Sequence, residues 1–106
     1  MSQVWFIMTE SRAQPGSGFP GPRDATIYVE CYVPESQIRN ALDRAEEALG
    51  REGFLMLNAT RCSRFDLDDW NDEEYPEGSD ARVVVERVLI HGEVEFGPFI
   101  YGSSDA

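Results

Sequence analysis

The residues best suited to specific chemistry gather in one acidic segment. Between Phe65 and Asp80 the chain carries eight of its twenty acidic residues and none of its nine basic residues. Aromatic side chains within such a segment can anchor an interface, and the negative charge speeds encounter with basic proteins. The segment therefore predicts a site for a basic protein partner, as in inhibitor or immunity proteins. Its residues are Asp66, Asp68, Asp69, Trp70, Asp72, Glu73, Glu74, Tyr75 and Glu77.

The same carboxylates also suit a divalent cation. Asp66, Asp68 and Glu77 match positions one, three and twelve of an EF-hand loop, but Trp70 stands at the fifth position, where an oxygen ligand is needed. Asn71 replaces the glycine of the sixth position. We therefore assign no metal site and no cofactor. A looser divalent-metal or small-ligand site remains the alternative, and so does a plain solvated loop whose Trp70 covers the edge of the core.

A second motif matches the sequence pattern of a phosphate-binding loop but not its structural context. Gly16 to Gly21 fits the pattern GxGxxG, which must join a strand to the amino terminus of a helix. Here Pro15, Pro20 and Pro22 crowd the segment, and a strand pattern follows it. We expect a hairpin connection over residues 11–24, with Phe19 exposed as a contact residue.

Nucleophilic catalysis has little support in the remaining reactive residues. His91 is the only histidine, and its place before Gly92 suits the carboxyl end of a helix. Cys31 and Cys62 are too few for a disulfide framework or a structural zinc site, so we expect free thiols. The acidic segment offers carboxylates for a hydrolase, but no pair stands out. We expect a protein without catalytic activity.

Charge excludes two classes of partner. The net charge is −11, and the sequence pI is near 4.3. Nucleic acids and anionic membranes bind cationic surfaces, so neither is an expected partner. All nine basic residues are arginine, which hints at a GC-rich, bacterial genome. Residues 1–8 lack the basic and apolar pattern of a signal peptide, so we expect a cytoplasmic protein.

Periodicity predicts the elements that would carry the acidic segment. Apolar residues alternate in 25–33, and Pro34 suits the first turn of a helix whose apolar stripe ends at Gly50 or Gly53. The segment 82–90 has helical spacing, although its three consecutive valines also suit a strand. We expect strands at 4–8, 25–33, 54–62 and 94–100, helices from Pro34 and after Ser79, an acidic loop at 65–80 and a frayed tail at 102–106.

These elements predict a single α+β domain spanning 1–106. Their order is strand, strand, helix, strand, helix, strand. Packing both helices on one face of a mostly antiparallel four-stranded sheet gives a two-layer sandwich, ferredoxin-like in general layout. Gly97-Pro98 should bulge the last strand or confine it to an edge. Such an edge strand could pair with a second copy of the chain, so we keep a homodimer as an alternative.

Overall fold

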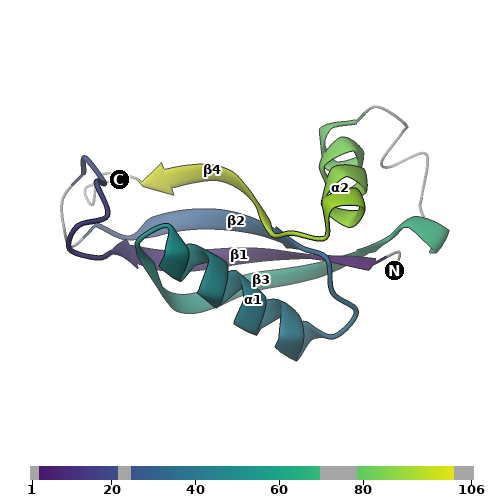
Figure 1. Cartoon of the computed structure of the whole chain (residues 1–106), viewed down its shortest axis with the longest axis horizontal. Helices are drawn as coiled ribbons and strands as arrows, with labels where there is room; N and C mark the ends of the chain where they lie inside the picture. Colours follow the sequence, from purple (N-terminus) through teal and green to yellow (C-terminus); the bar gives the residue numbers. More distant parts are fainter. Residues whose placement is uncertain (1–2, 22–24, 70–78, 102–106) are drawn as a thin grey trace.

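A computed structural model describes residues 3–21, 25–69 and 79–101. Its elements follow the expected order and form one antiparallel sheet with strand order β3-β1-β2-β4 (Figure 1). The α+β class is therefore confirmed. The elements are β1 (Gln3–Ala13), β2 (Ile27–Val33), α1 (Ile38–Arg51), β3 (Phe54–Asp66), the 3-10 turn η1 (Leu67–Asp69), α2 (Asp80–His91) and β4 (Glu95–Tyr101).

Strand β2 has the alternation that its sequence predicts. The four side chains expected to point inward are fully buried, and they are Ile27, Val29, Cys31 and Val33. The neighbouring strand β1 adds Ile7 to the same layer, together with the polar Thr9. Thr9 donates a hydrogen bond to the carbonyl oxygen of Val29 over 3.1 Å, so its hydroxyl group is satisfied inside the core.

Helix α1 closes this core with its apolar stripe. Ala41, Ala45 and Leu49 are fully buried against the sheet. The helix begins at Ile38, so Pro34 lies before it and not in its first turn as expected. After the last helical residue, Gly53 takes a φ of 88°, a left-handed conformation that glycine adopts without strain. The chain can then turn directly into β3.

The segment of three valines is helical. Helix α2 ends at His91, and Gly92 follows in the left-handed conformation with a φ of 69°. The prediction that this helix ends at Gly92 is therefore confirmed. Val85 and Val88 are buried with Val4 of β1 in a second, smaller cluster that also includes Phe65 and Leu67.

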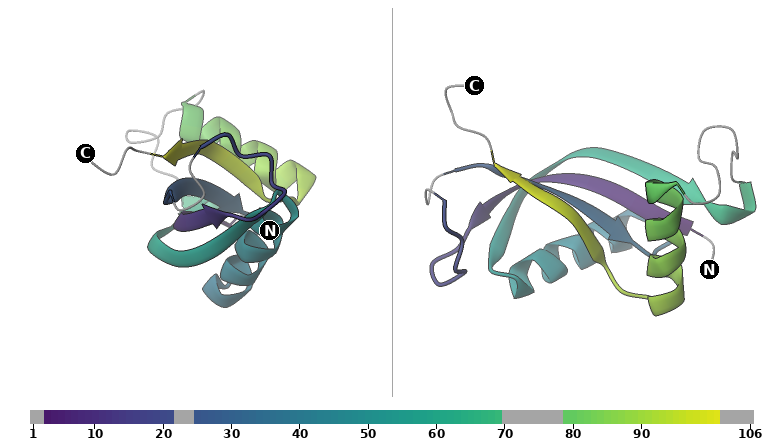
Figure 2. Two further views of the ribbon diagram at one scale, coloured as in Figure 1. Left: turned by 90° about the vertical axis from the view of Figure 1, so that its left-hand side faces the viewer. Right: turned by 90° about the horizontal axis from the view of Figure 1, so that it is seen from above.

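The two helices lie on opposite faces of the sheet, and the prediction that they share one face is wrong. Val4 belongs to the cluster of α2, whereas Ile7 belongs to the cluster of α1, and side chains three residues apart on a strand point to opposite faces. In the right-hand view of Figure 2, α2 lies in front of the sheet and α1 behind it.

The connectivity gives each helix a different crossing. Helix α1 joins β2 to β3 and crosses β1 on one face, while α2 joins β3 to β4 and must pass both β1 and β2 (Figure 1). α1 makes its crossing on one face of the sheet, and α2 makes its crossing on the other. The ferredoxin-like layout is not confirmed, because the strand order differs and the helices are split between the faces.

Three strands differ from their predicted lengths or shapes. β1 runs to Ala13, three residues into the predicted loop, and β3 runs to Asp66, beyond the predicted end at Cys62. β4 is an edge strand, and its pairing with β2 shifts where Gly97 and Pro98 lie opposite Glu30. The expected irregularity at this dipeptide is confirmed.

Candidate functional site

The acidic segment starts from a well-anchored turn. One carboxylate oxygen of Asp66 accepts a 2.9 Å hydrogen bond from the backbone N–H of Asp68, and the other accepts a 3.2 Å bond from the Gln3 side chain. Leu67 packs on the cluster around Val4. Asp66 therefore stabilises the turn that ends β3, and its contact with a partner stays a prediction.

Two of the expected contact residues are accessible to a partner directly after β3. Asp68 and Asp69 follow in η1, and both are exposed. The other six lie outside the described residues, and they are Trp70, Asp72, Glu73, Glu74, Tyr75 and Glu77. The structure thus positions the beginning of the predicted site.

The far end of the segment returns to the same hydrophobic cluster. Ser79 is the N-cap residue of α2, as expected, although its side chain makes no capping hydrogen bond. The helix then packs through Val85 against Val4, next to Phe65 and Leu67. Both ends of the acidic segment are therefore fixed at one end of the sheet.

The nearest arginines do not neutralise the described carboxylates. Arg61 and Arg64 precede the acidic segment in β3, but neither forms an ion pair with a described residue. In the pairing with β1, Arg64 lies opposite Trp5 and Arg61 lies opposite Met8, on the two faces of the sheet. The arginines of the observed salt bridges contact Glu35, Glu47, Glu86 and Glu95.

The salt bridge between Arg87 and Glu95 fixes α2 to β4. Its hydrogen bond from the Arg87 Nε to a Glu95 carboxylate oxygen is 2.9 Å long. This bond lowers the pKa of Glu95 below its ordinary value of 4.5, against the opposing effect of burial. Burial and the nearby Glu30 and Glu95 raise the pKa of Tyr32 on the same face. These shifts accompany packing of the helix on the sheet.

The glycine motif forms the connection between β1 and β2. Gly16 and Gly18 have φ values of 85° and 80°, and strand β2 follows, with no described helix in between. Phe19 is partly buried and not exposed as expected, because its ring packs edge-on against Tyr101 at a centroid distance of 5.0 Å. Phe19 is therefore a packing residue at the edge of the core.

Metal-binding and nucleophilic groups are dispersed in the described part of the chain. Residues 3–21, 25–69 and 79–101 hold no cluster of three or more His, Cys, Asp or Glu side chains. His91 is exposed at the end of α2. Cys31 is buried and Cys62 exposed, both as free thiols, and burial raises the pKa of Cys31 to about 12.

We expect one fast-reacting thiol in the native protein. Cys62 should react with a disulfide reagent at once, while Cys31 should react only as the protein unfolds, because its thiol is buried and protonated. The measurement is a thiol titration followed over time, with and without denaturant. Cys62→Ser should abolish the fast phase, and equal rates for both thiols in the native protein would contradict the burial of Cys31.

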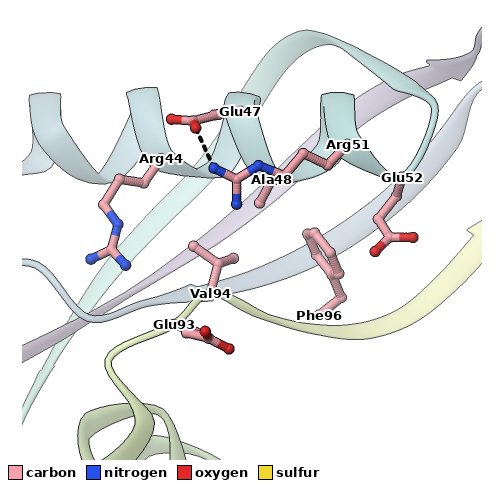
Figure 3. Close-up of a pocket in the computed structure, with 8 residues that line it drawn as sticks. All are labelled: Arg44, Glu47, Ala48, Arg51, Glu52, Glu93, Val94 and Phe96. Carbon is pink, nitrogen blue, oxygen red and sulfur yellow. Dashed lines mark hydrogen bonds and ion pairs between the residues drawn. The ribbon is translucent and has the colours of Figure 1, made fainter.

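A pocket of about 260 Å³ opens between α1 and the start of β4 (Figure 3). No sequence motif marks it: three of the four α1 residues that line it are charged, and the fourth is Ala48. Apolar groups from Ala48, Val94 and Phe96 line it beside charged ones. The charged residues are Arg44, Glu47, Arg51, Glu52 and Glu93.

Both arginines of the pocket are held by oxygen atoms of the protein itself. Arg44 donates hydrogen bonds to the carbonyl oxygens of Pro34 over 2.7 Å and Gly92 over 2.8 Å. Arg51 pairs with Glu47 one turn earlier on the same helix. Arg44 thus ties α1 to the turn between α2 and β4, and the pocket is better explained by packing than by ligand binding.

Neither helix of the described chain, at fourteen and twelve residues, has the length and apolar character that crossing a membrane requires. No protein-family model matches the chain, and neither the curated proteins nor the solved structures contain a match.

Proposed function

We propose that this domain is a non-enzymatic binding or regulatory protein that engages a basic protein partner through its acidic segment, Asp66 to Glu77. The observation that carries the proposal is the uneven distribution of charge. Residues 66–80 hold eight acids and no base, while the remaining chain holds twelve acids and nine arginines, close to balance. A basic partner is therefore drawn to one region of the molecule.

The described geometry supports the proposal at both ends of this segment. Asp68 and Asp69 are exposed just after β3, and Asp80 is exposed in the first turn of α2. The ends share one hydrophobic cluster, so the sheet and α2 provide a fixed base for the site. Trp70 and Tyr75 are the aromatic anchors that the sequence offers for such a contact.

A charge-neutralising variant tests this function. Asp68→Asn, Asp69→Asn, Glu73→Gln and Glu74→Gln should together weaken partner binding at least about tenfold and flatten its dependence on salt. Asp66 is left intact because it holds the turn after β3. The partner is first captured from host lysate by the wild-type protein, and affinities are then measured by titration calorimetry at several salt concentrations.

The matched control removes four acids elsewhere. Asp43→Asn, Glu46→Gln, Glu52→Gln and Glu93→Gln change the net charge equally, at exposed positions that make no ion pair with a described residue. Binding by this control should stay near that of the wild type. If both variants bound equally, or if no captured protein distinguished them, the acidic segment would not be the partner site.

A further inference from the structure

The face of the sheet that carries α2 is covered at one end only. Among the described elements, only α2 packs on this face, where it contacts β1 and β2 through Val4 and Tyr32. The register places nine side chains of this face beyond Phe6 and Tyr32, in the half away from α2, which we call the open face. They are Met8, Glu10, Arg12, Tyr28, Glu30, Leu55, Asn58, Arg61 and Ile100.

Large apolar groups are exposed on the open face. Tyr28 and Ile100 lie opposite each other on β2 and β4 and are 40% and 51% exposed, and Leu55 on β3 is 46% exposed. A contiguous exposed apolar patch is a mark of an interaction surface.

The outer side of α2 is apolar as well. Val83 is 44% exposed and Ile90 79% exposed. Seven residues apart, they share one side of the helix, and at 100° per residue that side lies opposite the buried Val85 and Val88. A helix that is apolar on two opposite sides suits a position between two packed layers. The described structure supplies only one of these layers.

The charge of the open face indicates which molecule supplies the second layer. The open face carries two glutamates, Glu10 and Glu30, and two arginines, Arg12 and Arg61, so it is neutral in a protein whose net charge is −11. A two-fold interface sets a surface against its own copy, and a surface of one sign would repel itself. A neutral face suits a second copy of this chain, whereas a basic partner would be drawn to the acidic segment.

We propose that the open face binds a second copy in a two-fold dimer. In one copy α2 covers one end of the face (Figure 2). Two copies with opposed strand directions would then fit together, with each α2 on the uncovered half of the other sheet. Val83 and Ile90 of one copy then contact the neighbourhood of Tyr28 and Leu55 of the other.

Salt separates this proposal from the proposed function. Two molecules of net charge −11 repel each other, and added salt screens that repulsion, so dimerisation should strengthen with salt. Binding of a basic partner should weaken with salt instead. The dimer assay needs only the protein itself, so either proposal can fail without the other.

Sedimentation equilibrium of the full chain at about 50 mM and 500 mM salt tests the dimer. We expect a dimer that tightens at the higher salt. Ile90→Arg and Leu55→Arg should each raise its Kd at least about tenfold. Asn40→Arg on α1 and Cys62→Arg on the other face of β3 are matched exposed controls that should leave it unchanged.

Circular dichroism of each variant confirms that it is folded before its assembly is compared. A wild-type protein that stays monomeric up to about 1 mM at both salt concentrations would overturn the proposal. A dimer that ignores Ile90→Arg and Leu55→Arg, or that responds equally to the controls, would also overturn it, because the contact would then lie elsewhere, for example at the edge of β4.

Discussion

Replacing Leu49 by alanine should lower the free energy of unfolding by about 2 to 5 kcal/mol. Leu49 is fully buried where α1 packs on β1 and β2, and truncation removes apolar contacts and leaves a cavity. A domain of this size has a total stability of about 5 to 15 kcal/mol, so the loss is a large fraction of it. Urea unfolding followed by circular dichroism measures the change.

Leu57→Ala is the matched control for this prediction. The same side chain at that position is 45% exposed on β3, so its removal should cost less than about 1 kcal/mol. Similar losses in the two variants would contradict the placement of Leu49 at the centre of the core.

Gly53→Ala should be nearly as destabilising, by about 2 to 4 kcal/mol. Gly53 has a φ of 88°, which a residue with a Cβ adopts only with strain. The added Cβ would also lie 2.6 Å from Cβ and 2.9 Å from Cα of Ser17. The backbone N–H of Gln14 donates to the carbonyl oxygen of Gly53 over 2.8 Å, so neither segment can move away freely. Thermal and urea unfolding both report the loss.

Gly50→Ala is the matched control for Gly53→Ala, and it should raise the stability that Gly53→Ala lowers. Gly50 lies within α1 at a negative φ, and outside the backbone of its own helix no atom of the described structure lies within 4 Å of its added Cβ. Alanine should stabilise the helix there by up to about 1 kcal/mol, because glycine has the larger conformational entropy in the unfolded chain. If both variants lost stability equally, the close contact between Gly53 and Ser17 would be wrong.

Elements with a regular local pattern were predictable. β2 alternates, and α1 repeats its apolar residues at helical spacing, so the buried sets follow from the order of residues alone. Gly92 identified the end of α2 even though its valines disfavour a helix. In each case the signal lies within a few residues of the element that it defines.

The lengths of β1 and β3 were less predictable, because their ends are stabilised by each other. Residues 11–13 look like the start of a loop, yet they pair with residues 54–56 of β3. Asp66 extends β3 because Gln3 lies opposite it. Pairing between residues about fifty apart leaves no trace in local periodicity.

For the candidate site, the sequence showed where the acidic residues are concentrated but not which contacts hold the start of the segment in place. The concentration of acids after Phe65 is evident from composition, whereas the structural role of Asp66 depends on the N–H of Asp68 and on Gln3. The open face was also hidden, because Tyr28, Leu55 and Ile100 come from three strands whose order no local pattern reveals.

The sequence by itself determined the α+β class, the order of the elements and the buried side of β2 and α1, because these depend on periodicity and on glycine signals that are local. Only the tertiary structure decided the strand order and the face on which α2 packs. An apolar stripe requires a partner but does not say which one. The link from β3 to β4 crosses the face opposite to α1, and this choice depends on contacts between residues far apart in the chain.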